Sequence, residues 1–267
     1  MLKYVSDLHL EYNFLTNTII KNIYSNKIHP TKYIALIGDI GNYNNNNNLN
    51  NFIKYCSQNY DKVLYVPGNH EYWSNDKYTM AEIKIKLNEI CNKHNVTLLD
   101  NNICYINNTK FIGSTLWSYV GNTHKQKIQT YFGNFKNIYK NKSTLLTIDD
   151  TNNFNKDAIK FIQNELNNTD LIPNNKQCIL LTHYAPIYCN PNLNQYTSNP
   201  IFYEKYAYDV YHSNIEYLIK KPITTCLYGH THYCSKFYRN NILYCSNQLG
   251  KNDPNFDLSS HIEIDHI

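Results

Sequence analysis

Arginine is almost absent from this chain, whose 267 residues contain a single one, Arg239. A site that grips phosphate with several guanidinium groups is therefore excluded. The net charge is +4 and the pI is about 8.4, below the pI above about 9 that is typical of a dedicated nucleic-acid-binding domain. Polybasic blocks and basic amphipathic helices are also missing, so the composition favours neither nucleic acid nor a membrane surface as a partner.

Long apolar runs are missing as well. Runs such as YIALI (33–37) and ILL (179–181) have the length of strands and fall far below the ~18 residues of a membrane span. Met1 leads directly into LKYVSD, without the apolar region and cleavage site of a signal peptide. We therefore expect a cytoplasmic protein that does not associate with membranes.

The cysteines form no CxxC pair and show no repeated spacing, although there are eight of them. Several stand inside apolar runs, where a free cysteine behaves as a small buried hydrophobic residue. Without a secretory signal, a reducing compartment and free thiols are expected.

What is present is a recurring unit: a short apolar strand that ends in polar residues. The unit occurs five times, at 2–9, 32–39, 62–70, 178–183 and 225–232. Continuous apolar strands of this kind are typical of sheets covered on both faces. With helical segments between them, they predict an α/β protein with one domain over residues 1–267.

Local patterns predict the other elements. Thr79 to Asn92 and Asn155 to Asn167 have helical spacing of apolar residues, and Thr79 with Glu82 forms a capping box. Hairpins are predicted at 104–113 and 236–245, each around an Asn-Asn pair. The asparagine-rich stretch 42–51 is interpreted as a loop, and 114–153 as an elaborated loop segment within the domain.

Polar residues that can bind metal ions or take part in catalysis follow the ends of these strands. Because the carboxyl ends of strands in an open α/β sheet meet at one crevice, we expect these residues to meet. They are Asp7, His9, Asp39, Asn69, His70, His183, His230 and His232. Their oxygen and nitrogen donors, without thiolates, suit Mn, Fe or Zn. All of them except His70 are candidate ligands, which is too many for one ion and indicates two ions that share a carboxylate.

Spacing supports this interpretation. Residues two apart in an extended segment point the same way, so Asp7 and His9 can reach one ion, and so can His230 and His232. Gly38 and Gly68 precede ligands, where a missing Cβ allows close approach of the backbone.

The motifs DLH, GD, GNHE, THYAP and GHTH, in this order over residues 7–232, resemble the calcineurin-like metallophosphoesterase superfamily. FIGSTLW (111–117), NFKNI (134–138) and SNQLG (246–250) are similar to its compact, single-domain microbial branch. The resemblance implies a four-layer α/β/β/α sandwich, with two mixed sheets face to face and helices outside.

The resemblance also implies a role for each residue. Asp7, His9 and His232 would hold one divalent ion, and Asn69, His183 and His230 the other. Asp39 would bridge both ions and His70 would assist the leaving oxygen; these two are the catalytic candidates. Mn is the expected metal, with Fe, Zn or Ni as alternatives. The expected reaction is attack on phosphorus by a hydroxide that bridges the two ions, with His70 as general acid.

Some positions depart from relatives. The protein serine/threonine phosphatases carry an Asp that orients the catalytic His and then an Arg that binds phosphate, where this chain has Asn42 and Tyr43. The sequence thus predicts that both groups are missing, which disfavours a phosphoprotein substrate. Tyr184 replaces the second His of a THHAP motif, with little expected cost. Glu71 is interpreted as a residue behind the ligands or on the surface.

The expected substrate is a phosphodiester or a small phosphomonoester. The alternatives are a metal-dependent nuclease and a non-catalytic scaffold on the same fold. The lysine- and aromatic-rich segment 117–142 could contact a nucleotide, but is interpreted first as a loop fixed by its aromatic residues. Arg239 is expected to face solvent from its hairpin. The sequence carries no signal for the oligomeric state.

Overall fold

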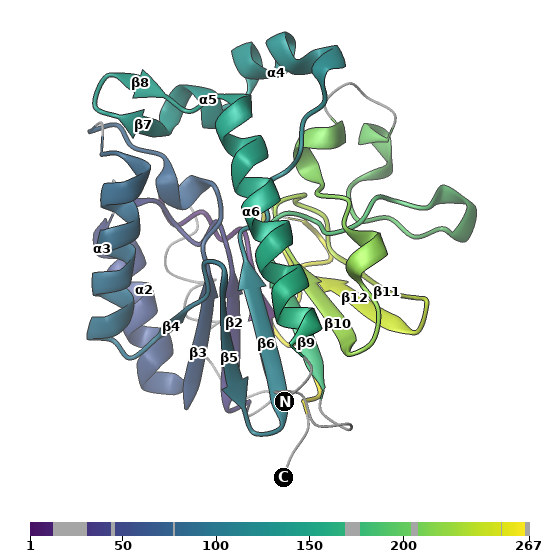
Figure 1. Ribbon diagram of the computed structural model, residues 1–267. Helices are drawn as coiled ribbons and strands as arrows, with labels where there is room; N and C mark the ends of the chain where they lie inside the picture. Colours follow the sequence, from purple (N-terminus) through teal and green to yellow (C-terminus); the bar gives the residue numbers. More distant parts are fainter. Residues whose placement is uncertain are drawn as a thin grey trace.

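The computed structural model describes residues 1–12, 31–43, 46–76, 78–168, 177–203, 208–251 and 253–264. Within these residues, two large β-sheets pack face to face with helices on their outer faces (Figure 1). The first sheet has the order β13-β1-β2-β3-β4, with β1 (Leu2–Val5), β2 (Tyr33–Ile37), β3 (Lys62–Val66), β4 (Thr97–Leu98) and β13 (His261–Ile262). The second has the order β11-β12-β10-β9-β6-β5, with β5 (Asn102–Ile106), β6 (Thr109–Ser114), β9 (Cys178–Thr182), β10 (Ile223–Tyr228), β11 (Ser235–Arg239) and β12 (Ile242–Ser246).

Both sheets are mixed, with parallel centres. β1, β2 and β3 run parallel, as do β6, β9, β10 and β12, while β13, β5 and β11 pair antiparallel at the edges. Because the central strands are parallel, their carboxyl ends lie at one edge of each sheet. The five strands predicted from apolar runs are β1, β2, β3, β9 and β10, and all five are confirmed.

The core has three apolar layers. Residues of β1, β2 and β3 face residues of β6, β9 and β10 between the sheets. Helices α2 (Asn46–Asn59) and α3 (Met80–Lys93) pack on the outer face of the first sheet, and α6 (Ile148–Asn167) packs on that of the second (Figure 1). The predicted fold class, a sandwich of two mixed sheets with flanking helices, is therefore confirmed.

Short elements complete the chain. Between β6 and α6 stand α4 (Lys125–Tyr131), α5 (Asn134–Asn137) and the small hairpin of β7 (Tyr139–Asn141) and β8 (Thr144–Leu145). The segment interpreted as an elaborated loop thus contains regular structure. Single 3-10 turns occur at η3 (His70–Tyr72), η4 (Asn122–His124), η6 (Pro191–Leu193), η7 (Pro200–Phe202), η8 (Tyr208–Tyr211) and η9 (Glu216–Leu218).

Several local predictions are confirmed. The capping box of α3 forms between Thr79 and Glu82, and both hairpins turn at their Asn-Asn pairs. Helix α6 begins at Ile148, earlier than predicted, because Thr147 and Asp150 form a second capping box. All eight cysteines are free thiols, as expected. Among the described residues, no helix is long and apolar enough to cross a membrane.

The interpretation of 42–51 as a loop is wrong for residues 46–51, which belong to helix α2. Helix α2 already begins at Asn46, although Asn44 and Asn45 lie outside the described residues. Asparagine is a poor helix former, but the helix places Leu49, Phe52 and Ile53 in the core with 0–1% exposure. Tertiary packing of this apolar face outweighs the local preference.

Arg239 does not face solvent, contrary to the prediction. Its side chain is 6% exposed and its Nε donates to Oε1 of Gln195 over 2.7 Å. Its Nη1 donates to the Tyr188 carbonyl (3.1 Å) and approaches Glu216 (3.3 Å). The loop at 188–195 covers the edge strand β11. The arginine is therefore buried between the loop and the strand, where it stabilises the fold.

Candidate metal centre

The loops after β1, β2, β3, β9 and β10 bring the predicted residues together. Five of them have left-handed backbone conformations, with φ of 54° at Asp7, 48° at His9, 51° at Asp39, 69° at His230 and 49° at His232. Such conformations are uncommon outside glycine and cost roughly 1–3 kcal/mol each. They turn the chain sharply at the strand ends, so that side chains from both sheets face one point.

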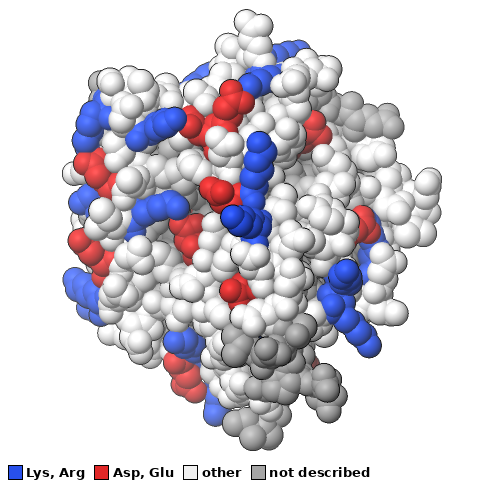
Figure 2. Space-filling model, viewed as in Figure 1, with Lys and Arg blue, Asp and Glu red and all other residues white. Residues whose placement is uncertain are grey.

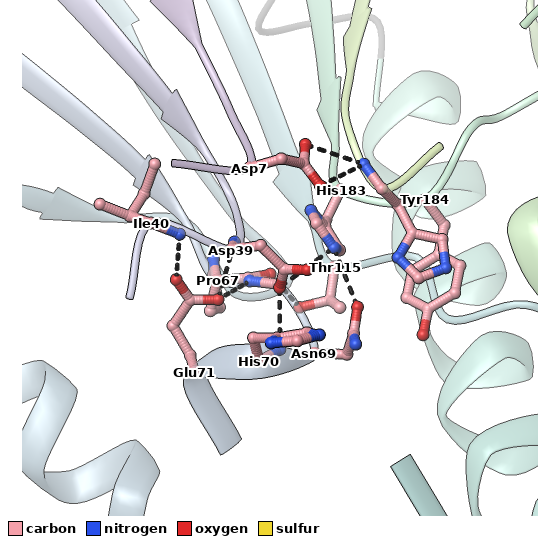
Figure 3. A network of polar contacts seen from close by, with 12 residues as sticks. Asp7, Asp39, Ile40, Pro67, Asn69, His70, Glu71, Thr115, His183 and Tyr184 are labelled. Atoms are coloured by element: carbon pink, nitrogen blue, oxygen red, sulfur yellow. Dashed lines mark hydrogen bonds and ion pairs between the residues drawn. The ribbon is translucent and has the colours of Figure 1, made fainter. Parts of the chain in front are cut away.

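The ligand atoms form three overlapping groups, and within each group they lie within 4.8 Å of one another. The groups are Asp7–His9–His232, His9–Asp39–His70 and Asp39–His183–His230. Asn69 joins the third group, since its Oδ1 lies 3.0 Å from Nε2 of His183. Figure 3 shows Asp7, Asp39, Asn69 and His183 converging. All eight sequence-predicted residues thus belong to one cluster, with Asp39 at its middle.

Two histidines of this cluster are fixed by main-chain carbonyl groups. Nδ1 of His183 lies 3.0 Å from the Ile37 carbonyl, and Nε2 of His230 lies 3.2 Å from the Val210 carbonyl. A carbonyl only accepts, so these nitrogens carry the ring protons. In the neutral form of each ring, the opposite nitrogens, Nε2 of His183 and Nδ1 of His230, keep a lone pair, which is how metal-binding histidines are commonly held.

His9 is fixed by a side chain instead. Its Nδ1 lies 3.1 Å from Oε1 of Glu11, and its Nε2 lies 3.0 Å from Nε2 of His232. The carboxylate makes Nδ1 the donor, so the lone pair on Nε2 of His9 points at another ring nitrogen. One of these nitrogens donates a hydrogen bond to the other when it carries a proton, and both can bind a cation between them when neither does.

The electrostatics of the cluster also favour positive charge at its centre. Asp7 and Asp39 are 0% and 1% exposed, and they form ion pairs with His232 (3.4 Å) and His183 (3.3 Å), respectively. Burial opposes ionisation of His183, but Asp39 raises its pKa to about 9. Burial and the nearby His183 lower the pKa of His230 to about 3, so this ring is neutral. Two buried carboxylates with imidazole and amide donors match a divalent cation site.

His70 stands at the rim of the cluster. Its backbone N–H donates to Oδ1 of Asp39 (2.8 Å), and its ring stacks on Trp73 with centroids 3.7 Å apart. Its Nδ1 lies 3.0 Å from Oε1 of Glu11, the oxygen that also contacts His9. Its side chain is 15% exposed and helps to line the adjoining cavity.

Glu11 corrects the prediction that an orienting carboxylate is missing. Asn42 replaces the aspartate of the relatives, but Glu11 supplies a carboxylate to Nδ1 of His70 from a different loop. Burial opposes its charge, yet the hydrogen bonds from His70 and His9 lower the pKa of Glu11 to about 2. Sequence reasoning missed it, although its position two residues after His9 continues the spacing of Asp7 and His9.

Glu71 lies behind Asp39 and is fully buried, not at the surface (Figure 3). Its carboxylate accepts from the N–H groups of Asp39 (2.9 Å), Ile40 (2.7 Å), Gly41 (3.3 Å) and Gly68 (2.6 Å), and from the Tyr65 hydroxyl (2.9 Å). Burial and the nearby Asp39 raise the pKa of Glu71 to about 7. Glu71 thereby holds together the loops that carry Asp39 and Asn69.

Glycine is required beside the cluster, as predicted. A Cβ on Gly38 would lie 2.2 Å from Nδ1 of His183, and Gly38 has φ of +78°. A Cβ on Gly68 would lie 2.2 Å from Oδ1 of Asp39. Both distances are impossible for real atoms, so any other residue would displace a ligand.

Asn134 is a second residue that the sequence analysis did not assign. Its Oδ1 accepts from Nδ2 of Asn69 (2.8 Å) and from the Trp73 indole (3.0 Å), and its Nδ2 donates to the Tyr184 hydroxyl (3.1 Å). It therefore turns the oxygen of Asn69 toward His183. The Tyr184 ring packs on His230 with centroids 3.9 Å apart. The NFKNI motif, which begins with Asn134, was the sequence feature that could have identified this residue.

A cavity of about 780 Å³ opens beside the cluster. Asp39, Asn69, His70, His230 and His232 form one wall of it. Part of the segment 117–142 lines it as well, through Trp117, Phe132, Gly133, Asn134 and Phe135. Lys125 is directed away into an ion pair with Asp149, so aromatic rings and an amide are what this segment offers to the cavity.

Comparison with known proteins agrees with this geometry. Residues 2–234 match the model of a family described as calcineurin-like phosphoesterase. An uncharacterized protein of Acanthamoeba polyphaga mimivirus is 36% identical over 279 residues, covering 100% of this chain and 98% of that protein.

Two solved structures share the fold. The phosphopantetheinyl hydrolase of Mycobacterium tuberculosis superposes with a TM-score of 0.70 at 14% identity, over 93% of this chain and 89% of that one. A putative 5'-nucleotidase of Staphylococcus aureus superposes with a TM-score of 0.51 at 13% identity, over 92% of this chain but 48% of that one. At these identities the likeness concerns the fold.

Proposed function

Because this chain belongs to the calcineurin-like phosphoesterase family of metal-dependent hydrolases, we propose that it hydrolyses a phosphodiester or small phosphomonoester at a two-metal centre. Asp7, His9 and His232 would hold one ion, and Asn69, His183 and His230 would hold the other. Asp39 would be shared by the two. The observation that carries the proposal is the overlap of the ligand groups, since Asp39 stands in two groups that otherwise share no residue.

The donor set suits two ions of borderline hardness, and manganese is our first choice. Such ions supply a nucleophilic water at neutral pH and neutralise charge on the phosphoryl oxygens. This second contribution matters here, because the single arginine is buried elsewhere. The chain itself offers no guanidinium group to the phosphate.

His70 donates the proton that the leaving oxygen needs. In the imidazolium form, Nδ1–H is held by Glu11 at 3.0 Å, so the proton to be donated is on Nε2. Once it has left, the neutral ring keeps Nδ1–H and its hydrogen bond. Trp73, stacked on the ring, prevents rotation. Help of this kind contributes roughly 10²–10⁴-fold to rate.

A nuclease would need a basic surface along which nucleic acid binds. The face in Figure 2 instead carries lysines and acidic residues interspersed, without an area of one sign. A scaffold that has lost catalysis would have no need of all eight residues, which the structure keeps in one cluster. A small phosphate ester is therefore the better-supported substrate.

The test is hydrolysis of para-nitrophenyl phosphate and bis(para-nitrophenyl) phosphate with added Mn²⁺, followed by addition of a chelator. We expect turnover that the chelator abolishes and that Mn²⁺ restores. The preferred ester then separates monoesterase from diesterase. Folded protein that binds Mn²⁺ and hydrolyses neither ester would favour the scaffold alternative.

A further inference from the structure

The cavity beside the metal centre has an aromatic wall that the hydrolysis of phosphate does not itself require. It begins at Trp73, which stacks on His70. Phe132 follows, next to Gly133, where a Cβ would lie 2.6 Å from the Trp73 ring. Phe132 contacts Tyr211 at 6.3 Å, and Tyr211 stacks with Phe202 at 5.8 Å and 25°. Three segments far apart in the sequence thus build one continuous wall.

Trp73, Phe132 and Tyr211 pack against the core, but none of these rings is enclosed by it. Trp73, Phe132, Phe202 and Tyr211 are each half-buried and line the cavity. The wall also ends at the ligands, since Tyr211 lies 5.8 Å from the ring of His230. Half-buried aromatic groups that border a cavity commonly mark a binding surface.

Most of the uncharged polar groups of the cavity are hydroxyls and amides. Ser118, Thr151 and Tyr233 line it with hydroxyls, and Asn199 and Asn255 with amides, and both kinds of group can donate and accept hydrogen bonds. Beyond the ligands and His70, the charged side chains among the described lining residues are Lys251 and Asp253, of opposite sign. A substrate with a second phosphate would find one lysine there, balanced by an aspartate.

The volume of about 780 Å³ is within the range of pockets that enclose drug-sized molecules. Aromatic faces favour flat rings, amides favour ring edges that donate and accept, and the near-zero charge disfavours polyanions. We infer that, given the proposed phosphoesterase activity, the substrate is a single-phosphate ester that carries a planar, uncharged heteroaromatic group, as a mononucleotide does. The phosphate lies at the metal centre and the heteroaromatic ring against Phe202 and Tyr211.

The experiment compares pairs of substrates that differ only in the ring. With Mn²⁺ present, kcat/KM is measured for adenosine monophosphate against ribose phosphate, and for the methyl diester of each. We expect the compound with the base to be preferred roughly 10- to 100-fold, the range that stacking of one base provides. Phe202→Ala should reduce this preference several-fold, chiefly through KM, and Phe202→Trp should restore it.

Tyr217→Ala is the matched control, because Tyr217 is 66% exposed and does not line the cavity. It should leave the preference unchanged. Chelator-sensitive hydrolysis with equal efficiency on both members of each pair would overturn the inference about the substrate and leave the proposed function standing. Loss of the preference in Tyr217→Ala as well would show that the aromatic wall is not its source.

A binding measurement keeps the inference testable without turnover. Titration calorimetry of Mn²⁺-loaded His70→Ala should show tighter binding of adenosine monophosphate than of ribose phosphate, and Phe202→Ala in that background should remove the difference. Equal binding of the two would overturn the inference whether or not the enzyme is active. The same titration is repeated with a short oligothymidylate. If the oligothymidylate bound more tightly than adenosine monophosphate and its affinity fell steeply with salt, the result would contradict a small-molecule substrate and indicate single-stranded nucleic acid.

Discussion

His183 and His230, on one side of the candidate centre, are oriented by main-chain carbonyls, whereas His9, on the other, is oriented by the carboxylate of Glu11. Exposure does not follow this division: His183 and His9, one from each side, are 0% and 4% exposed, whereas His230 is half-buried and His232 is 31% exposed. A main-chain carbonyl is neutral and is positioned by the fold itself, so His183 and His230 are oriented by the backbone. A carboxylate carries charge, and that of Glu11 contacts both His9 and His70, so the orientation of His9 is linked to that of His70.

From this difference we propose that the two sides have different functions. The His183 side would bind a cation tightly and rigidly. The His9 side shares its orienting group with the residue proposed as the acid, so changes there should affect binding and proton transfer together. Asp39 is shared by both sides, so its replacement should weaken metal binding on both of them.

The largest effect is expected for Asp39→Asn. The variant should lose metal on both sides and lose more activity than the roughly 10²–10⁴-fold expected from removal of a general acid. Metal analysis of the purified variant, alongside circular dichroism to show that it is folded, makes the measurement. An unchanged metal count would contradict the bridging role.

His70→Ala separates proton transfer from metal binding. It should keep both ions while kcat falls by roughly 10²–10⁴-fold for esters with poor leaving groups. The loss should be smaller with para-nitrophenol, a leaving group that needs little protonation. Equal losses on both kinds of ester would rule out the acid role and leave His70 as a support for Asp39.

Replacement of the orienting carboxylate, Glu11, should have a smaller effect, on metal binding and on kcat together. Glu11→Gln is expected to weaken metal binding on the His9 side and to lower kcat, by roughly 10- to 100-fold, as is usual when a group behind a ligand is removed. Glu11→Asp should recover part of both. If Glu11→Gln changed kcat but not metal affinity, Glu11 would serve His70 alone.

Glu71→Gln tests whether the carboxylate that accepts from main-chain N–H groups stabilises the fold more than the carboxylate of Glu11 does. The amide nitrogen would replace one carboxylate oxygen and direct its N–H groups at the two backbone donors that this oxygen now accepts from, so the free energy of unfolding should fall by about 1–3 kcal/mol. Urea denaturation should show a larger loss than for Glu11→Gln, because the carboxylate of Glu11 accepts from the side chains of His9 and His70. The opposite order would contradict the division between the sides.

The clustering of the candidate ligands could be predicted from sequence because each of them follows an apolar strand, and strand ends of parallel sheets meet. Glu11 could not be paired with His70, because the left-handed turns at Asp7 and His9 that direct it are invisible in a pattern of residue types. Asn134 comes from a segment with weak periodicity, so its contact with Asn69 depends on how that segment packs. Arg239 was predicted wrongly because its burial depends on a loop that covers the edge strand.

The most direct test of the central claim is electron paramagnetic resonance of the metal-free protein as Mn²⁺ is added. The account predicts that two equivalents bind, that spectra of the loaded protein show two spin-coupled ions, and that turnover rises with the second equivalent. Asp39→Asn should give no coupled signal. Full turnover with one bound ion, or two ions that are not coupled, would contradict a centre bridged by Asp39.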